Sequence, residues 1–173
     1  MQAKRRTPLE VASRKRFALI AFIVFLVDDA TKAIAISVLP NHSVAVLGSL
    51  LRLNLRFNSG AAFSFATDKT VFLSAFAVIV AGLVLLYVPR VTNKLWLLTF
   101  GLLFGGIVGN LADRIFRAPG FLRGQVVDWI ELPHWPTFNV ADSSIVIAAV
   151  ITVYLSARNI KPTAPQQRSG SGE

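Results

Sequence analysis

Four stretches of the chain are almost continuously apolar and long enough to cross a bilayer as helices. A hydrocarbon core of about 30 Å needs roughly 20 helical residues. The four stretches are residues 17–39, 71–88, 95–115 and 138–157. The second contains no charged residue, whereas Asp28, Asp29 and Lys32 interrupt the first. This pattern predicts an all-α integral membrane protein with four transmembrane helices, the first of which we expect to remain as an uncleaved anchor.

Between the first two stretches the pattern changes to strict alternation. In "LRLNLRFN" (51–58) leucine and phenylalanine alternate with arginine and asparagine. A period of two is typical of a β-strand with one apolar face. We therefore expect a small extracytoplasmic β element over residues 41–66. The second outer connection, residues 116–137, contains Gly, Pro, Trp129 and Trp135, which predicts a loop with indoles at the membrane interface.

The charges are distributed unevenly between the two sides that this topology defines. Eleven of the eighteen basic residues, but only two of the nine acids, fall in the two ends and the middle connection, which share one side. This is the positive-inside pattern, so both termini are predicted to be cytoplasmic. This distribution also argues against nucleic-acid binding as the explanation of the net charge of +9. The predicted parts are a basic N-terminus (1–16), the four-helix domain (17–157) and a disordered cytoplasmic tail (158–173).

Polar residues reach one membrane layer from three of the predicted helices. The sequence N-x-A-D occurs twice, as Asn110 to Asp113 and as Asn139 to Asp142. The spacing i, i+3 puts both polar side chains on one helix face. At 1.5 Å per residue, Asn110 and Asp142 stand about 24 Å from the inner basic flanks, and Asp28 about 18 Å. Ionisable groups at such depth are costly and indicate a functional site.

The available side chains favour carboxylate chemistry. There is no cysteine, and the two histidines form no ligand pair, so thiolate catalysis is excluded and a metal site is not expected. Two carboxylates in one low-dielectric pocket share a proton, as the base and acid of an aspartic peptidase require. Three other interpretations stay open: capping of the last helix by Asn139 or Asp142, transport along a polar path, and an assembly subunit.

Five short motifs occur in order along roughly residues 17–157, and together they resemble the lipoprotein signal peptidase family, signal peptidase II. The motifs are D-x-x-T-K as "DDATK" (28–32), N-x-G-A-A-F as "NSGAAF" (58–63), G-G-x-x-G-N-x-x-D-R as "GGIVGNLADR" (105–114), V-V-D-[FW] as "VVDWI" (126–130) and F-N-x-A-D as "FNVADS" (138–143). One position departs from the family pattern, because Asp29 stands where the family usually has Gln.

The resemblance implies an aspartic endopeptidase of the bacterial cytoplasmic (inner) membrane, with its active site at the outer face. It would remove the signal peptide of prolipoproteins by cutting before the diacylglyceryl-modified cysteine. Its catalytic pair would be Asp128 and Asp142. The residues expected to bind substrate or support the pocket are Asp28, Lys32, Asn58, Gly60, Asn110, Asp113, Arg114 and Asn139. Arg114 is expected to pair with Asp28 or Asp113. We expect no metal, no cofactor and no nucleic-acid partner. The expected partners of a monomeric enzyme are prolipoproteins and membrane lipid.

Overall fold

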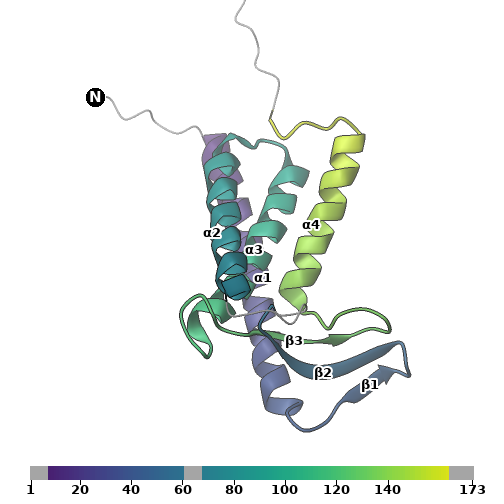
Figure 1. Ribbon diagram of the computed structural model, residues 1–173. Helices are drawn as coiled ribbons and strands as arrows, with labels where there is room; N and C mark the ends of the chain where they lie inside the picture. The colour runs from purple at the N-terminus through teal and green to yellow at the C-terminus, as the bar shows by residue number, and fades with distance from the viewer. Residues whose placement is uncertain (1–7, 61–67, 164–173) are drawn as a thin grey trace, which may run out of the picture.

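The computed structural model describes residues 8–60 and 68–163 and has four long helices with a small sheet at one end (Figure 1). The helices are α1 (Pro8–Val38), α2 (Asp68–Tyr87), α3 (Lys94–Phe116) and α4 (Val140–Ala157), and the short 3-10 helix η1 (Val88–Arg90) follows α2. The strands are β1 (Val44–Leu47), β2 (Leu51–Asn58) and β3 (Val126–Glu131). The start of α1 and the end of α4 lie together at the end of the bundle away from the sheet.

Three helices in the described part of the chain are long and apolar enough to cross a membrane. They are Thr70–Arg90, Lys94–Phe116 and Val140–Ala157, with mean hydropathies of 2.7, 1.8 and 1.9. Large apolar side chains on two of these helices, such as Phe72, Leu86 and Val153, are 69–70% exposed, as lipid-facing surfaces are. The chain is thus a multi-pass membrane protein. α1 has 31 residues, but Asp28, Asp29 and Lys32 interrupt its apolar stretch, so its crossing stays a prediction.

Helix α3 lies in contact with each of the other three long helices. Small residues on α3 allow this close approach. A Cβ atom at Gly105 would lie 2.7 Å from Cβ of Val24 on α1, and one at Gly109 would lie 2.6 Å from Oδ2 of Asp28 and 3.3 Å from Cβ of Ala141 on α4. Both distances to the α1 side chains are too short for any side chain larger than hydrogen. The close packing brings polar groups of α1, α3 and α4 to one level.

The three strands form an antiparallel sheet in the order β1-β2-β3. The alternation over residues 51–58 correctly predicted β2, whereas β3 lies in the segment 116–137, which we expected to be a loop. The reason for the error is visible in β3, where Val126, Val127 and Asp128 are all buried. A strand covered on both faces does not alternate. Residues 61–66 of the expected β element lie outside the described residues.

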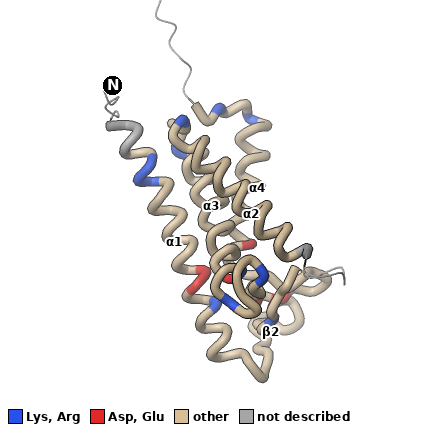
Figure 2. The backbone as a smooth tube through the Cα atoms, turned by 60° about the vertical axis from the view of Figure 1, so that its left-hand side comes forward, with Lys and Arg blue, Asp and Glu red and all other residues tan. Residues whose placement is uncertain are grey.

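The charges divide along the bundle axis. Figure 2 shows coloured Asp and Glu positions in the half nearer the sheet, whereas Lys and Arg predominate at the opposite end, where α1 also carries Glu10. At that opposite end the first residues of the expected tail are held in place, because the carbonyl of Ile160 accepts from Nε1 of Trp96 over 2.8 Å. The carbonyl of Pro162 also accepts from the backbone of Thr92. Residues 158–163 therefore pack against the start of α3.

Candidate active site

Strand β3 holds Asp128 at the junction of the sheet and the helices. β3 pairs with β2 in a register that sets Asp128 opposite Arg56 and Val126 opposite Asn58. Asp128 is 2% exposed. Its Oδ2 atom accepts a hydrogen bond from Nδ2 of Asn58 over 2.9 Å, and its Oδ1 atom accepts one from Nδ2 of Asn139 over 2.7 Å. Each oxygen of this carboxylate therefore has an amide donor.

Asp142 belongs to the first turn of α4, where it takes part in a capping box. Asn139 is the N-cap residue, and its Oδ1 atom accepts from the backbone N–H of Asp142 over 2.9 Å. In return, Oδ2 of Asp142 accepts from the backbone N–H of Asn139 over 3.2 Å. The capping interpretation of these two residues is thus confirmed. Capping is not their only role, because Oδ1 of Asp142 also accepts from Nδ2 of Asn110 over 2.7 Å.

Helix α3 contributes Asn110 and Arg114, which lie one turn apart. Asn110 accepts through Oδ1 from Nδ2 of Asn139 over 3.1 Å while it donates to Asp142. Nη1 of Arg114 donates to two backbone carbonyls, those of Ser59 (3.3 Å) and Gly124 (3.2 Å). Arg114 thus ties α3 to the end of β2 and to the segment before β3.

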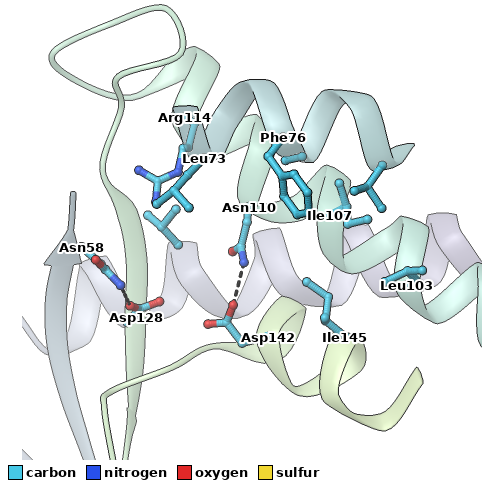
Figure 3. A pocket seen from close by; sticks show the side chains of 13 residues that line it. Asn58, Leu73, Phe76, Leu103, Ile107, Asn110, Arg114, Asp128, Asp142 and Ile145 are labelled. Atoms are coloured by element: carbon cyan, nitrogen blue, oxygen red, sulfur yellow. Dashed lines mark hydrogen bonds between the residues drawn. The ribbon is translucent and has the colours of Figure 1, made fainter. Parts of the chain in front are cut away.

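A cavity of about 330 Å³ lies between the helices and the sheet. At one end it has polar side chains from β2, β3, α3 and α4, and Figure 3 shows Asp128 and Asp142 facing the same space. The polar lining residues are Asn58, Asn110, Arg114, Asp128 and Asp142. The rest of the wall is apolar and comes mainly from α2, α3 and α4: Leu73, Phe76, Ala77, Val80, Leu103, Ile107, Val126 and Ile145.

Behind the cavity lies a buried ionic cluster that does not line it. Nζ of Lys32 lies 2.6 Å from Oδ2 of Asp28 and 2.8 Å from Oδ2 of Asp113. Asp113 also pairs with Arg117, and it accepts from the backbone N–H of Val127 over 3.2 Å. The carboxylates that we expected to pair with Arg114 therefore have other partners in the described part of the chain. Asp28 further accepts from the backbone N–H of Ala141, which joins α1 to α4.

Burial changes the acidity of one member of the carboxylate pair. The pKa of Asp128 is raised from its ordinary value to about 6, chiefly because burial disfavours the charged form. The hydrogen bonds from Asn58 and Asn139 act against this rise, and the nearby charge of Asp142 adds to it. A carboxyl with such a pKa holds its proton up to about pH 6. Two carboxyl groups on one cavity are able to act as an acid and a base.

The structure brings together most of the residues selected from the sequence, in two groups. Asn58, Asn110 and Arg114 line the cavity with the two aspartates, whereas Asp28, Lys32, Asp113 and Asn139 lie behind it. Gly60 (φ +81°) lies at the rim, where its backbone N–H donates to Oδ1 of Asn58 over 2.7 Å.

Sequence reasoning missed the apolar wall formed by α2, including Leu73, Phe76 and Val80. A helix that is apolar on all sides gives no signal that separates a pocket face from a lipid face. Among the described residues, no group of three or more His, Asp or Glu side chains is placed to hold a metal ion.

Comparisons with known proteins agree with this geometry. A lipoprotein signal peptidase of Leifsonia xyli subsp. xyli is 41% identical over 170 residues, which cover 96% of this chain and 79% of that protein. One of Mycobacterium leprae is 44% identical over 138 residues, covering 79% and 69%. A solved structure described as a bacterial membrane enzyme, determined in meso at 1.9 Å resolution, superposes with a TM-score of 0.74 at 27% identity and covers 83% of this chain and 93% of its own.

A second in meso bacterial membrane enzyme, at 2.3 Å resolution, gives a TM-score of 0.72 at 26% identity over 86% of this chain and 93% of that one. The family model described as signal peptidase (SPase) II matches residues 20–158. That match covers α2, α3, α4 and all three strands, and it covers α1 from residue 20 onward. A membrane chain with this sheet, this cavity and these relatives belongs to the signal peptidase II family of proteases.

Proposed function

We propose that this chain is an intramembrane aspartic endopeptidase that removes the signal peptide from prolipoproteins. The observation that carries the proposal is the pair Asp128 and Asp142, held by asparagine amides on one cavity that has an apolar wall. The substrate class comes from the family and from relatives whose names describe lipoprotein signal peptidases. The cavity supports the chemistry, because its described titratable groups are two aspartates and one arginine.

The environments of the two aspartates differ, and the difference assigns their roles. Asp142 lies in the first turn of α4, where the helix dipole favours a negative charge and its Oδ2 atom accepts from the backbone N–H of Asn139. Asp128 is buried in the sheet, and burial raises its pKa to about 6. We therefore assign the role of the base to Asp142 and that of the acid to Asp128.

Hydrolysis then proceeds in two proton-balanced steps. Asp142 takes a proton from water as the water oxygen attacks the scissile carbonyl carbon, and Asp128 gives its proton to the carbonyl oxygen. A neutral tetrahedral diol results. In the second step the C–N bond breaks, Asp142 returns its proton to the leaving nitrogen, and a hydroxyl of the diol returns one to Asp128. Both carboxyls end in their starting states.

The cavity walls suit a substrate that is apolar on one side of the scissile bond. The apolar helix of a signal peptide lies against the wall formed by α2, α3 and α4, where Phe76, Val80 and Ile145 project. The cut falls before the diacylglyceryl-modified cysteine, whose acyl chains remain in the surrounding lipid. Burial in lipid contributes roughly 0.8 kcal/mol per methylene group, so the modification anchors the substrate in the membrane in which the enzyme lies.

The distribution of charge orients the enzyme in the cytoplasmic (inner) membrane of a bacterium. Lys and Arg predominate at the end of the bundle away from the sheet (Figure 2), where α1 also carries Glu10, and the positive-inside tendency puts this end in the cytoplasm. The sheet and the carboxylate pair then lie at the outer face, and α1 is the fourth membrane span. One chain supplies both aspartates and their donors, so the enzyme acts as a monomer.

The decisive test uses purified protein in detergent with two versions of one prolipoprotein, with and without the diacylglyceryl group. We expect cleavage before the cysteine of the modified substrate only, at the same rate with and without EDTA, because aspartates activate water without a metal. Cleavage of neither substrate would remove the proposed function. Loss of activity in EDTA that added zinc restores would remove the two-aspartate mechanism.

A further inference from the structure

Lys32 is a fully buried cation whose ammonium group lies within 3.0 Å of polar atoms from three different residues. It is 1% exposed, and its Nζ atom lies near Asp28 on α1 (2.6 Å) and Asp113 on α3 (2.8 Å). The third partner is uncharged: Nζ donates to Oδ1 of Asn110 over 3.0 Å. The two carboxylates account for the charge of the lysine, and they hold α1 against α3. They do not account for the bond to Asn110.

The bond to Asn110 fixes which way its amide points. An ammonium group only donates, so the atom of Asn110 that faces Lys32 is the carbonyl oxygen. The NH₂ group must then face the other way, where it donates to Oδ1 of Asp142 over 2.7 Å. Nδ2 of Asn139 also reaches Oδ1 of Asn110 at 3.1 Å, but it makes a shorter bond of 2.7 Å to Asp128. Lys32 therefore provides the principal constraint on this amide.

The same arrangement occurs at the two other asparagines that contact the carboxylate pair. The backbone N–H of Gly60 donates to Oδ1 of Asn58, so Nδ2 of Asn58 faces Asp128. The backbone N–H of Asp142 donates to Oδ1 of Asn139, so Nδ2 of Asn139 also faces Asp128. Each amide has a donor on its oxygen and presents its NH₂ group to a carboxylate. The donors to Asn58 and Asn139 are backbone N–H groups, whereas Lys32, which donates to Asn110, is a side chain. Lys32 can therefore be removed by substitution.

We propose that Lys32 is a positioning residue for catalysis, which acts on Asp142 through the amide of Asn110. By donating to Oδ1 of Asn110, Lys32 obliges the amide to donate to Asp142 and so keeps that carboxylate correctly placed. Without Lys32, only the longer bond from Nδ2 of Asn139 opposes a half-turn of the amide that would set its oxygen against Oδ1 of Asp142. Two facing acceptors repel, so the carboxylate would lose a donor and the position in which it acts as the base. This inference rests on the proposed function.

The chain contains a matched control for the loss of charge. Lys32 and Arg117 are both cationic partners of Asp113, but within the described residues only Lys32 donates to Asn110. We expect Lys32→Met to lower kcat by about tenfold or more while KM changes by about twofold or less, as loss of the general base requires. Arg117→Met should keep kcat within about threefold of the parent. Equal losses of kcat in the two variants would overturn the proposal.

Lys32→Met removes a cation that neutralises Asp28 and Asp113. The substitution is therefore also tested in a variant in which one of these negative charges is removed. The double variant Lys32→Met/Asp28→Asn is compared with Asp28→Asn alone, with folding checked by thermal unfolding in detergent. The drop in kcat should reappear in the double variant. If the double variant is folded and as active as Asp28→Asn, Lys32 has no positioning role.

A double-mutant cycle identifies the path through the amide. In an Asn110→Ala background Lys32→Met should change kcat by about twofold or less, because the side chain through which it acts is gone. A full, additive loss in that background would place the effect of Lys32 elsewhere and overturn the proposal. Failure of the proposed function is distinct from these outcomes, since it appears as absent cleavage by the parent protein.

Discussion

Nδ2 of Asn110 donates to Oδ1 of Asp142 over 2.7 Å, and this bond joins the outer part of α3 to the first turn of α4. Oδ1 of Asn110 at the same time accepts from Asn139 and Lys32. One amide is therefore shared between the carboxylate pair and the ionic cluster behind it. Substitution of Lys32 should consequently affect catalysis, whereas substitutions of the pair should have little effect on the cluster.

The first prediction concerns the pair itself. Asp128→Asn and Asp142→Asn should each abolish cleavage of a diacylglyceryl-modified prolipoprotein, because an amide neither accepts a proton from water nor donates one to a carbonyl oxygen. Product formation is measured on gels with purified protein in detergent. Asp29→Asn is the control, since Asp29 is an exposed acid on α1 next to buried Asp28. It should cleave at the parental rate. Near-parental turnover by either pair variant would remove that residue from the mechanism.

A second prediction concerns the pH dependence of kcat/KM. Burial raises the pKa of Asp128 to about 6, so this group keeps its proton up to that pH and loses it above. If Asp128 is the acid, kcat/KM should fall as the pH rises through this range. Initial rates between pH 5 and pH 9 at low substrate concentration give the profile. A profile that is flat over this whole range contradicts the role of Asp128 as the acid.

The same raised pKa predicts an effect on stability. The native state holds the Asp128 proton up to about pH 6, whereas the unfolded chain releases it near the ordinary pKa of 3.8. The native state thus binds more protons between these values, and the contribution to the free energy of unfolding falls as the pH rises through them, by about 3 kcal/mol at most. Asp128→Asn should lack this component. Thermal unfolding of both proteins at pH 4.5 and 7.5 measures the difference.

The sequence predicted that polar residues of different helices lie at one level of the bundle. Both N-x-A-D patterns lie at the end of an apolar helix, and the bilayer sets the length of such helices. The sequence did not predict how Asp113 and Arg114 are used. Consecutive residues of a helix point about 100° apart, so Asp113 faces α1 and the sheet while its neighbour Arg114 faces the cavity. Adjacent opposite charges suggest a pair in the sequence, but the helix separates them.

The strand β3 shows a second limit of the sequence. Its residues Val126 and Val127 are 4% and 0% exposed, because β3 packs against α1 and α3. No alternation marks such a strand, and only the pairing with β2 reveals it. Asp128 was therefore assigned from its motif alone, while the neighbours that shift its pKa, Asn58, Asn139 and Asp142, come from β2 and the start of α4.

A third prediction tests the packing that holds the ionic cluster. Gly109→Ala should destabilise the protein and reduce activity, because the added methyl group would lie 2.6 Å from Oδ2 of Asp28 and 3.3 Å from Cβ of Ala141. Overpacking of this kind costs about 1–3 kcal/mol. Gly82→Ala is the control, since a methyl group there meets nothing within 4 Å, and alanine favours a helix by about 1 kcal/mol. Thermal unfolding in detergent should move in opposite directions for the two variants.

A fourth prediction concerns Arg114, whose guanidinium donates to the carbonyls of Ser59 and Gly124. Arg114→Ala should lose activity and stability, because two buried acceptors lose a charged donor, at a cost on the order of 3 kcal/mol. Arg114→Lys keeps the charge but not the planar fork of donors, so it should retain part of both. Rates and unfolding temperatures of the two variants are compared with the parent. An alanine variant that cleaves and melts like the parent contradicts the supporting role.

The last prediction is that α1 crosses the membrane, although it contains charged residues. Asp28 and Lys32 are buried against α3, where they satisfy each other, so the helix does not present these two charges to lipid, and it should cross despite them. The chain has no cysteine, which allows single cysteines to be introduced at exposed positions on either side of α1. Ala12 lies near its start and Ser43 just after its end, and both are exposed.

A membrane-impermeant maleimide applied to intact spheroplasts should label Ser43→Cys and leave Ala12→Cys unlabelled, whereas permeabilised cells should label both. Lys161→Cys, exposed after α4, should behave like Ala12→Cys, because the three crossings that follow α1 return the chain to the cytoplasm. Retained cleavage activity shows that each variant is folded. Labelling of Ala12→Cys and Ser43→Cys from the same side would mean that α1 does not cross. Asp142 would then stand at the outer face with only three spans around it, and the proposed topology would have to be abandoned.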